Sequence, residues 1–501
     1  MTFEIVFVLL SLLGMMAALI ADKMRPGMVL FSVVVLFLCV GILTPKEMLE
    51  GFSNKGMITV ALLFLVSEGI RQSGTLGQVI KKLLPQGKTT VFKAQLRILP
   101  SVAFISAFLN NTPVVVIFAP IIKHWAKSVK LPATKFLIPL SYVTILGGIC
   151  TLIGTSTNLV VHGMILEAGY EGFTMFELGK VGIFIAIAGI IYLFIFSKRL
   201  LPDARPDTAV PDEEVEEGEK LHRVEAVLGA RFPGINKKLS DFNFQRHYGA
   251  EVKEIKTRNG QRYVDHLEDV VLREGDTLVV MADDTFIPTW GESSVFVLLT
   301  NGNDPDTSGK KKRWLALILL VLMIVGATVG ELPATKEMFP DIKLDMFFFV
   351  CITTIIMAWT NIFPARKYTK YISWDILITI ACAFAISKAM VNSGVADCVA
   401  GFIIGLSDDY GPHVLLAILF VITNLFTELI TNNAAAALAF PLALSISAQL
   451  GVSPTPFFVV ICMAASASFS TPIGYQTNLI VQGIGNYKFT CLLYTSDAAD
   501  E

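Results

Sequence analysis

The chain has 501 residues, of which 53% are hydrophobic and only 16% are charged, and its mean hydropathy is +0.63. Soluble globular chains carry about 25% charged residues, so this composition excludes an ordinary soluble enzyme, a disordered scaffold and a nucleic-acid binder. The net charge of −2 gives no overall field for a polyanionic or polycationic partner. The 35 Phe and 37 Gly residues fit a chain that crosses a membrane many times.

Ten apolar runs predict membrane helices, because an apolar helix needs about 20 residues to cross the hydrocarbon core. These runs are 2–21, 28–43, 57–70, 135–153, 181–196, 314–329, 346–359, 376–390, 396–406 and 414–426. Two further apolar runs, 101–122 and 434–450, carry Pro and Asn pairs near their starts. We therefore expect a polytopic α-helical membrane protein. Its first run is expected to be an anchor helix, since the basic stretch of a cleaved signal does not precede it.

A charged segment, 201–312, separates the two apolar halves, 1–200 and 313–489. Basic residues flank this insert on both sides, at 197–199 and at 310–313. Lys and Arg concentrate in cytoplasmic loops, so the insert is expected in the cytoplasm and the chain in the inner cell membrane.

The alternation of apolar and polar residues inside the insert predicts a small α/β domain. We expect a strand at 224–228, a short helix opening at 234–239, a second strand after 248–252 and a third after the turn in 272–278.

The two halves carry the same polar residues in the same order, about 320 positions apart. Asn111 corresponds to Asn432, 321 positions later, and the string 157–163 corresponds to 477–483, 320 positions later. Secondary transporters are often built from two inverted copies of one unit, and the copies meet at the binding site. We therefore expect two inverted repeats.

Two pairs of motifs interrupt the apolar sequence at matching places. The polar triplets 110–112 and 431–433 each stand inside an apolar run, and Pro113 disfavours a helical approach to the first. A chain that breaks at membrane depth must be shielded from lipid. We expect re-entrant hairpins near 92–125 and 414–448, with the triplets at their tips.

The second pair of motifs is 154–158 and 471–478, where Gly, hydroxyl and amide residues predict an unwound stretch followed by a half-helix. Side-chain oxygens and freed carbonyls suit Na⁺, while half-helix N-termini suit an anion. None of the four motifs contains Asp, Glu, Lys or Arg, which favours an anion whose charge is offset by bound Na⁺. Glu428, directly before the second triplet, is a candidate gating or orienting residue.

With these motifs, about 390 residues of the chain resemble the divalent anion/sodium symporter family, which carries sulfate or dicarboxylates. The resemblance implies that the anion is bound by Asn110, Asn111, Thr112, Thr155, Ser156, Thr157, Thr431, Asn432, Asn433, Gln476 and Thr477. It implies two Na⁺ sites, one at Asn111, Gly154 and Asn158 and the other at Asn432, Gly474 and Asn478. Na⁺ is the expected coupling ion, and a homodimer is the implied assembly.

The unwound stretches depart from the dicarboxylate branch, which usually has Pro where this chain has Ser156 and Gln476. They look more like the sulfate-type branch, so sulfate is the expected anion and a dicarboxylate the alternative. The insert is similar to the TrkA-C type of regulatory domain and is expected either to bind a small effector or to act as a rigid wedge. The tail 490–501 is atypical, because the family continues into another spanning helix at this point.

One alternative is an effector-gated ion channel or an exchanger controlled by the insert. A channel predicts a pore lined by rings of charge or carbonyls, whereas this sequence has two repeat-related pockets. An enzyme is not expected, since no nucleophile and base, and no metal cluster, stand at the end of a span. No nucleic acid is expected as a partner.

Overall fold

The computed structural model describes residues 2–21, 24–85, 87–201, 222–229, 232–257, 261–283, 286, 290, 295–300, 310–339, 342–405, 411–471, 474–485 and 487. The predicted tail 490–501 lies outside the described residues. Helices dominate both halves, and one antiparallel sheet lies between the halves in the sequence.

The first half consists of ten α-helices and one 3₁₀ turn. They are α1 (Phe3–Ile20), α2 (Pro26–Val40), α3 (Pro45–Glu50), η1 (Gly51–Ser53), α4 (Lys55–Gln72), α5 (Thr75–Leu83), α6 (Val91–Ser106), α7 (Asn111–Ser128), α8 (Thr134–Gly148), α9 (Ser156–Glu167) and α10 (Gly179–Leu200). The predicted run 101–122 is thus divided between α6 and α7, as expected for a hairpin.

The second half repeats much of this order. Its elements are α13 (Lys310–Gly330), α14 (Pro333–Met338), α15 (Met346–Trp359), η3 (Ala365–Lys367), α16 (Tyr368–Tyr371), α17 (Trp374–Asn392), α18 (Val395–Gly405), α19 (Pro412–Leu429), α20 (Asn432–Leu450), α21 (Thr455–Ser466) and α22 (Gln476–Gly485). Helices α4 to α9 and α17 to α22 correspond one to one at an offset of 319 to 321 residues, judged by where each helix begins.

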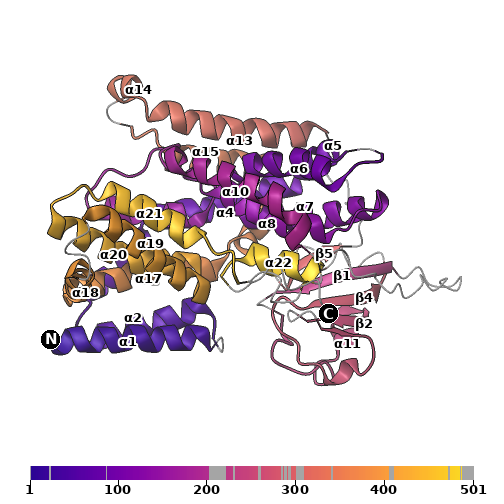
Figure 1. Cartoon of the computed structure of the whole chain (residues 1–501), viewed down its shortest axis with the longest axis horizontal. Helices are drawn as coiled ribbons and strands as arrows, with labels where there is room; N and C mark the ends of the chain where they lie inside the picture. The colour runs from indigo at the N-terminus through magenta and orange to yellow at the C-terminus, as the bar shows by residue number, and fades with distance from the viewer. Residues whose placement is uncertain are drawn as a thin grey trace, which may run out of the picture.

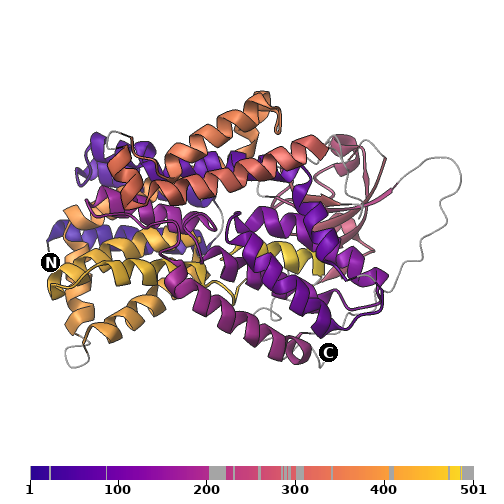
Figure 2. The ribbon, with the colours of Figure 1, turned by 90° about the horizontal axis from the view of Figure 1, so that it is seen from above.

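Seven helices in the described residues are long and apolar enough to cross a membrane, which confirms a multi-pass membrane protein. They run mainly along the long axis of the molecule (Figure 2). The outermost of them keep large apolar side chains exposed, for example Phe184 of α10 at 73% and Trp314 of α13 at 68%. Exposed apolar faces of this extent suit contact with lipid.

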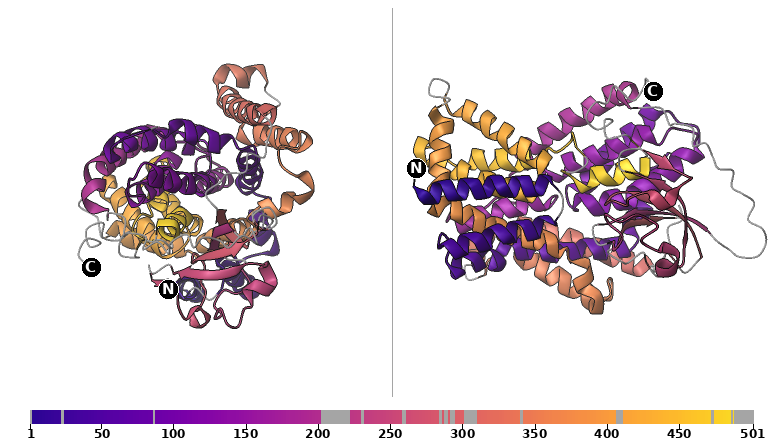
Figure 3. Two further views of the ribbon diagram at one scale, coloured as in Figure 1. Left: turned by 90° about the vertical axis from the view of Figure 1, so that its right-hand side faces the viewer. Right: turned by 90° about the horizontal axis from the view of Figure 1, so that it is seen from below.

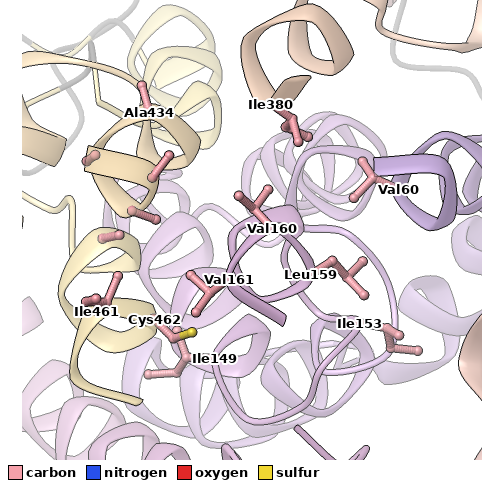
Figure 4. Close-up of a cluster of buried hydrophobic side chains, with 14 of the residues drawn as sticks. Val60, Ile149, Ile153, Leu159, Val160, Val161, Ile380, Ala434, Ile461 and Cys462 are labelled. Carbon is pink, nitrogen blue, oxygen red and sulfur yellow. The ribbon is translucent and has the colours of Figure 1, made fainter. Parts of the chain in front are cut away.

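A cluster of buried apolar side chains joins the two halves around α9 (Figure 4). Leu159, Val160 and Val161 of α9 lie in this cluster with Ala434 of α20 and Cys462 of α21. Helix α20 continues with buried alanines to position 437, and small side chains allow close approach of helices inside a membrane. This packing holds the first helical turn of α9 next to that of α20.

The insert contains a five-stranded sheet in the order β3-β2-β4-β1-β5, and every neighbouring pair is antiparallel. The strands are β1 (His222–Leu228), β2 (Glu251–Lys256), β3 (Arg262–Tyr263), β4 (Thr277–Ala282) and β5 (Phe296–Thr300). Strand β1 covers the predicted segment 224–228, and β2 and β4 lie where the predicted segments 248–252 and 272–278 lead into strands. An aromatic cluster formed by Phe232, Phe242, Phe244, Tyr248 and Phe296 supports the sheet.

The short helix predicted at 234–239 is wrong, because this segment forms consecutive turns. Asn236 has a φ of 63°, in the left-handed region, and a right-handed helix cannot continue through it. Lys238 also pairs with Val271 as an isolated bridge. The described residues of the insert instead form a short helix at α11 (Phe244–Tyr248), and a 3₁₀ turn, η2 (Leu267–Asp269), follows β3.

The sheet lies beside α22 at one end of the helical body (Figures 1 and 3). A Cβ atom added to Gly275, in the turn before β4, would lie 2.6 Å from the Leu479 side chain of α22. Lys123 of α7 donates to both carboxylate oxygens of Glu225 in β1, at 3.0 and 2.9 Å. The insert therefore contacts α7 and α22, which both begin at predicted site residues.

Candidate functional site

Both predicted tips are places where a helix ends and a new one begins. Helix α6 ends at Ser106 and α7 begins at Asn111, while α19 ends at Leu429 and α20 begins at Asn432. Pro113 is tolerated in the first turn of α7, where no intrahelical partner for its missing N–H is needed. Each tip thus leaves the N-terminus of one helix open.

The two predicted unwound stretches are also present. Helix α8 ends at Gly148 and α9 begins at Ser156, and α21 ends at Ser466 before α22 begins at Gln476. Pro472 and Ile473 of the second stretch lie outside the described residues. Of the predicted residues, Ser156, Thr157, Asn158, Thr477 and Asn478 belong to the first turns of these half-helices.

Matching hydrogen bonds hold the two tips. The Ser106 hydroxyl lies 2.8 Å from Oδ1 of Asn111, and Thr427, 321 positions after Ser106, places its hydroxyl 3.1 Å from Oδ1 of Asn432. All four residues are buried. The same bond in both copies shows that the tips share a geometry and not only a sequence pattern.

The two unwound stretches are held in the same duplicated way. Nδ2 of Asn158 donates to the Thr151 carbonyl at 2.8 Å, and Nδ2 of Asn478 donates to the Thr471 carbonyl at 3.2 Å. These bonds use the amide N–H groups, so the amide oxygens stay available for other partners. Oδ1 of Asn158 is buried and has no hydrogen-bond partner among the described residues.

Each tip meets the half-helix of the other copy. Thr112, behind the first tip, bonds to Gln476 at the start of α22, with 3.5 Å between the oxygens. Asn433, behind the second tip, accepts from Ser156 at 3.2 Å and from Thr157 at 3.3 Å, at the start of α9. Asn433 is the repeat mate of Thr112, and Gln476 is the repeat mate of Ser156, so the two contacts are equivalent.

Tyr475 joins the two halves of this arrangement, and the sequence analysis missed it. Nδ2 of Asn111 donates to the phenol oxygen at 2.5 Å, and the hydroxyl of Thr155 lies 3.1 Å from it. Asn432 is a further polar neighbour of the phenol. The available signal was its place in the second motif, 320 positions after Thr155.

Several oxygen atoms lie close to two glycines at the first tip. A Cβ atom added to Gly148 would lie 2.6 Å from Oδ1 of Asn111, and one added to Gly154 would lie 2.5 Å from the Gly148 carbonyl oxygen. The Gly148 carbonyl oxygen also lies 3.4 Å from Nδ2 of Asn158, whose Oδ1 has no partner among the described residues. Hard oxygen ligands of this kind suit Na⁺.

The second tip has a comparable set of oxygens. A Cβ atom at Gly474 would collide with Oγ of Ser468 and would lie 2.5 Å from the Thr427 carbonyl oxygen. The hydroxyls of Ser468 and Thr431 are buried without hydrogen-bond partners in the described part of the chain. Oδ1 of Asn478 differs from its mate, because the Ser141 hydroxyl lies 2.7 Å from it.

The remaining predicted residues lie close by. The hydroxyls of Ser141 and Thr477 are 2.9 Å apart, so Thr477 faces α8. Asn110 and Ser156 line the same small cavity, with Ser67 of α4. The structure therefore brings the predicted residues of both copies together at one junction.

Glu428 is the acidic residue next to this junction. Its Oε1 accepts from the backbone N–H groups of Phe469 and Ser470, at 3.0 and 3.1 Å, and so orients the second unwound stretch. Its Oε2 is buried without a partner among the described residues.

The helices α7, α9, α20 and α22 all begin at this junction, as the contacts between their first turns show. A helix N-terminus carries a partial positive charge and unpaired N–H groups. The sequence places no Asp, Glu, Lys or Arg in 107–115, 149–158, 429–435 or 467–478. The junction can therefore hold an anion by neutral donors and helix ends.

Broken helices that meet in pairs within a polytopic helical body define a membrane transporter. The chain belongs to the citrate transporter family, CitMHS, whose model matches residues 16–446 and 338–495. This places it among the divalent anion/sodium symporters, as the sequence motifs predicted. The chain is 28% identical to an uncharacterized transporter of Synechocystis, over 91% of this chain and 88% of that protein.

Two further relatives have the same class of function in their names. An uncharacterized transporter of Escherichia coli strain K12 is 26% identical, over 97% of this chain and 95% of that protein. Sodium/sulfate cotransporter 2 of Chlamydomonas reinhardtii is 30% identical over 53% of this chain, which corresponds to 30% of that protein.

Proposed function

We propose that the protein is a secondary active transporter that imports a small divalent anion, sulfate, together with Na⁺. The observation that carries this proposal is the convergence of four helix N-termini on one junction lined by neutral amide and hydroxyl groups. The sodium/sulfate cotransporter among the relatives, which matches about half of the chain, supports the choice of ion and anion.

In this proposal, the anion lies between the two tips and contacts Asn110, Asn111, Thr112, Thr155, Ser156, Thr157, Thr431, Asn432, Asn433, Gln476 and Thr477. One Na⁺ binds at Asn111, Gly154 and Asn158, and a second at Asn432, Gly474 and Asn478. Two bound cations offset the charge of a divalent anion that no Arg or Lys of the tips neutralises. Ordered binding with Na⁺ first is therefore expected, and the loaded half then moves against a scaffold half.

We further propose that the chain lies in the inner cell membrane as inverted repeats, in a homodimer, with the insert in the cytoplasm. The basic residues 310–313 at the start of α13 support this orientation. The insert is proposed to be a TrkA-C-type regulatory domain that binds a small effector. A cavity of about 330 Å³ next to Arg273 and His266, and the contact of the same turn with α22, support that role.

A dicarboxylate is the second candidate substrate, because its two carboxylates also suit paired helix ends. Uptake of labelled sulfate and of labelled succinate into proteoliposomes, with and without an inward Na⁺ gradient, separates the two. Sulfate uptake that needs the gradient supports the proposal. Uptake of either anion that is indifferent to Na⁺ contradicts symport, and a current with no accumulation would favour the effector-gated channel.

The Asn111→Ala and Asn432→Ala variants test the role of the tips. Each change removes an amide oxygen from a proposed Na⁺ site and a polar group next to Tyr475, so we expect Na⁺-dependent uptake to fall at least about tenfold, as loss of one hydrogen bond to a charged group implies. Asn392→Ala is the matched control, since Asn392 bonds to the Ile42 carbonyl and Glu47, away from the junction. Unchanged uptake in both tip variants would remove the tips from the mechanism.

A further inference from the structure

Tyr475 lies where the two repeats meet. It precedes α22 directly, and its repeat mate Thr155 precedes α9 directly, 320 positions earlier. The two side-chain hydroxyls are 3.1 Å apart. A residue that contacts its own repeat mate must lie at the pseudosymmetry axis, and the phenol is therefore placed between the two tips.

The phenol hydroxyl is suited to meet a guest at this point. Asn111 donates to its oxygen, so the single O–H proton stays free to donate to Thr155 or to a bound anion. The side chain is 8% exposed and is held from both copies, because Asn432 is also its neighbour. A fixed, neutral donor in a buried site is a strong contributor to anion binding.

The difference between the mates is one of size. Thr155 carries a short side chain, whereas Tyr475 places an aromatic ring at the equivalent position, so the repeats leave unequal space on the two sides of the axis. Next to Asn111, the Tyr475 ring therefore takes up room that a threonine at the same position would leave. A tetrahedral oxyanion concentrates its charge on one centre, but a four-carbon dicarboxylate carries charge at two ends that each need room.

We propose that Tyr475 selects the transported anion by size, donating its hydroxyl to a compact tetrahedral dianion while its ring excludes longer dicarboxylates. This inference rests on the proposed anion symport and names the residue that decides between its two candidate substrates. Tyr475 is a specificity-determining residue at the centre of the junction.

The test compares three variants with the parent chain in proteoliposomes under an inward Na⁺ gradient. Tyr475→Thr copies the mate Thr155 and removes the ring, while Tyr475→Phe keeps the ring and removes only the donor. Tyr487→Phe is the matched control, because the Tyr487 hydroxyl is buried against the Thr134 carbonyl, outside the tips. The measurement is kcat/KM for labelled sulfate and for labelled succinate.

We expect Tyr475→Thr to lower the sulfate-to-succinate ratio of kcat/KM by at least about tenfold, as a change of pocket size does in other sites. Tyr475→Phe is expected to raise KM for sulfate by about tenfold and to keep succinate excluded. The Tyr487→Phe control should leave kcat/KM unchanged for both anions.

An unchanged ratio in Tyr475→Thr overturns the inference. If that variant does not fold, Tyr475→Phe decides alone, since an unaltered KM for sulfate overturns it equally. A parent chain that transports neither anion contradicts the proposed function itself. A parent chain that takes up succinate in preference to sulfate leaves symport of a divalent anion standing, but it overturns the choice of sulfate and the selection by Tyr475.

Discussion

Glycines at the junction matter because of the oxygens that surround them. Gly154 and Gly474 are repeat mates, and a Cβ atom at either would lie against a carbonyl or hydroxyl oxygen. Neither has a positive φ, so the requirement is for space and not for an unusual backbone. The same absence of a side chain that lets these oxygens approach makes the position intolerant of substitution.

We therefore expect Gly154→Ala and Gly474→Ala to destabilise the protein by about 1–3 kcal/mol, the usual cost of overpacking, and to abolish its stabilisation by Na⁺. The measurement is thermal unfolding of detergent-solubilised protein with and without NaCl, with KCl at equal ionic strength as reference. Gly14→Ala is the control, because nothing lies within 4 Å of a Cβ atom there. A Na⁺ response that survives both junction changes would place the cations elsewhere.

Sequence reasoning predicted the amides at the junction and missed several of its hydroxyls, Ser141 among them. Asn111 and Asn158 stand in polar motifs with mates about 320 positions away, and repetition is a signal that can be read locally. Ser141 stands alone in an apolar helix, and its partner Asn478 is 337 positions away. No local pattern predicts such a contact, since only the packing of α8 against α22 creates it.

At the scale of elements, the helix breaks were predictable and the insert was only partly so. A Pro or a polar triplet inside an apolar run has few structural solutions in a membrane. The sequence of segment 234–239 is compatible with a helix or with a series of turns. The isolated bridge between Lys238 and Val271 favours the turns, because it uses backbone groups that a helix would need. That bridge joins residues 33 positions apart, so the local sequence could not reveal it.

The contact of β1 with α7 gives an element-scale prediction with a defined pH range. Burial alone would raise the pKa of Glu225. The positive charges of Lys123 and Lys256 outweigh this effect and lower the pKa from 4.5 to about 2. Because the pKa is lowered in the folded protein, the ion pair contributes fully to docking of the insert at pH values above 4.5, the ordinary pKa of the carboxyl group. This contribution is lost as the pH falls from about 4.5 towards 2.

Glu225→Gln should lower the unfolding temperature by about 2–4 °C at pH 7, the usual effect of ~1 kcal/mol. The difference from the parent chain should shrink as the pH falls below about 4.5 and vanish only below about 2, where the parent carboxylate is also protonated. Glu251→Gln is the control, because its pair with Lys253 is more than half exposed on both side chains. If both changes lower the unfolding temperature equally at pH 7, the ion pair between Glu225 and Lys123 of α7 contributes nothing to docking of the insert.

At the scale of the whole molecule, the insert and α14 lie towards opposite ends of the long axis (Figure 1). Helix α13 connects them, starting from the basic residues 310–313 and ending at Gly330. Because most apolar helices follow this axis, one end faces each side of the membrane. The charge of the loops favours the cytoplasm for the insert, and the structure makes that orientation accessible to a direct measurement.

Cysteines placed at two exposed positions report the orientation. We expect Lys336→Cys in α14 to react with a membrane-impermeant maleimide in intact cells, and Lys253→Cys in β2 to react only after the membrane is permeabilised. Both lysines are exposed, so access to the reagent, and not burial, decides the result. The background is the chain with Cys39, which is exposed in α2, replaced by Ser. The reverse pattern would place the insert outside and would contradict a regulatory domain that samples the cytoplasm.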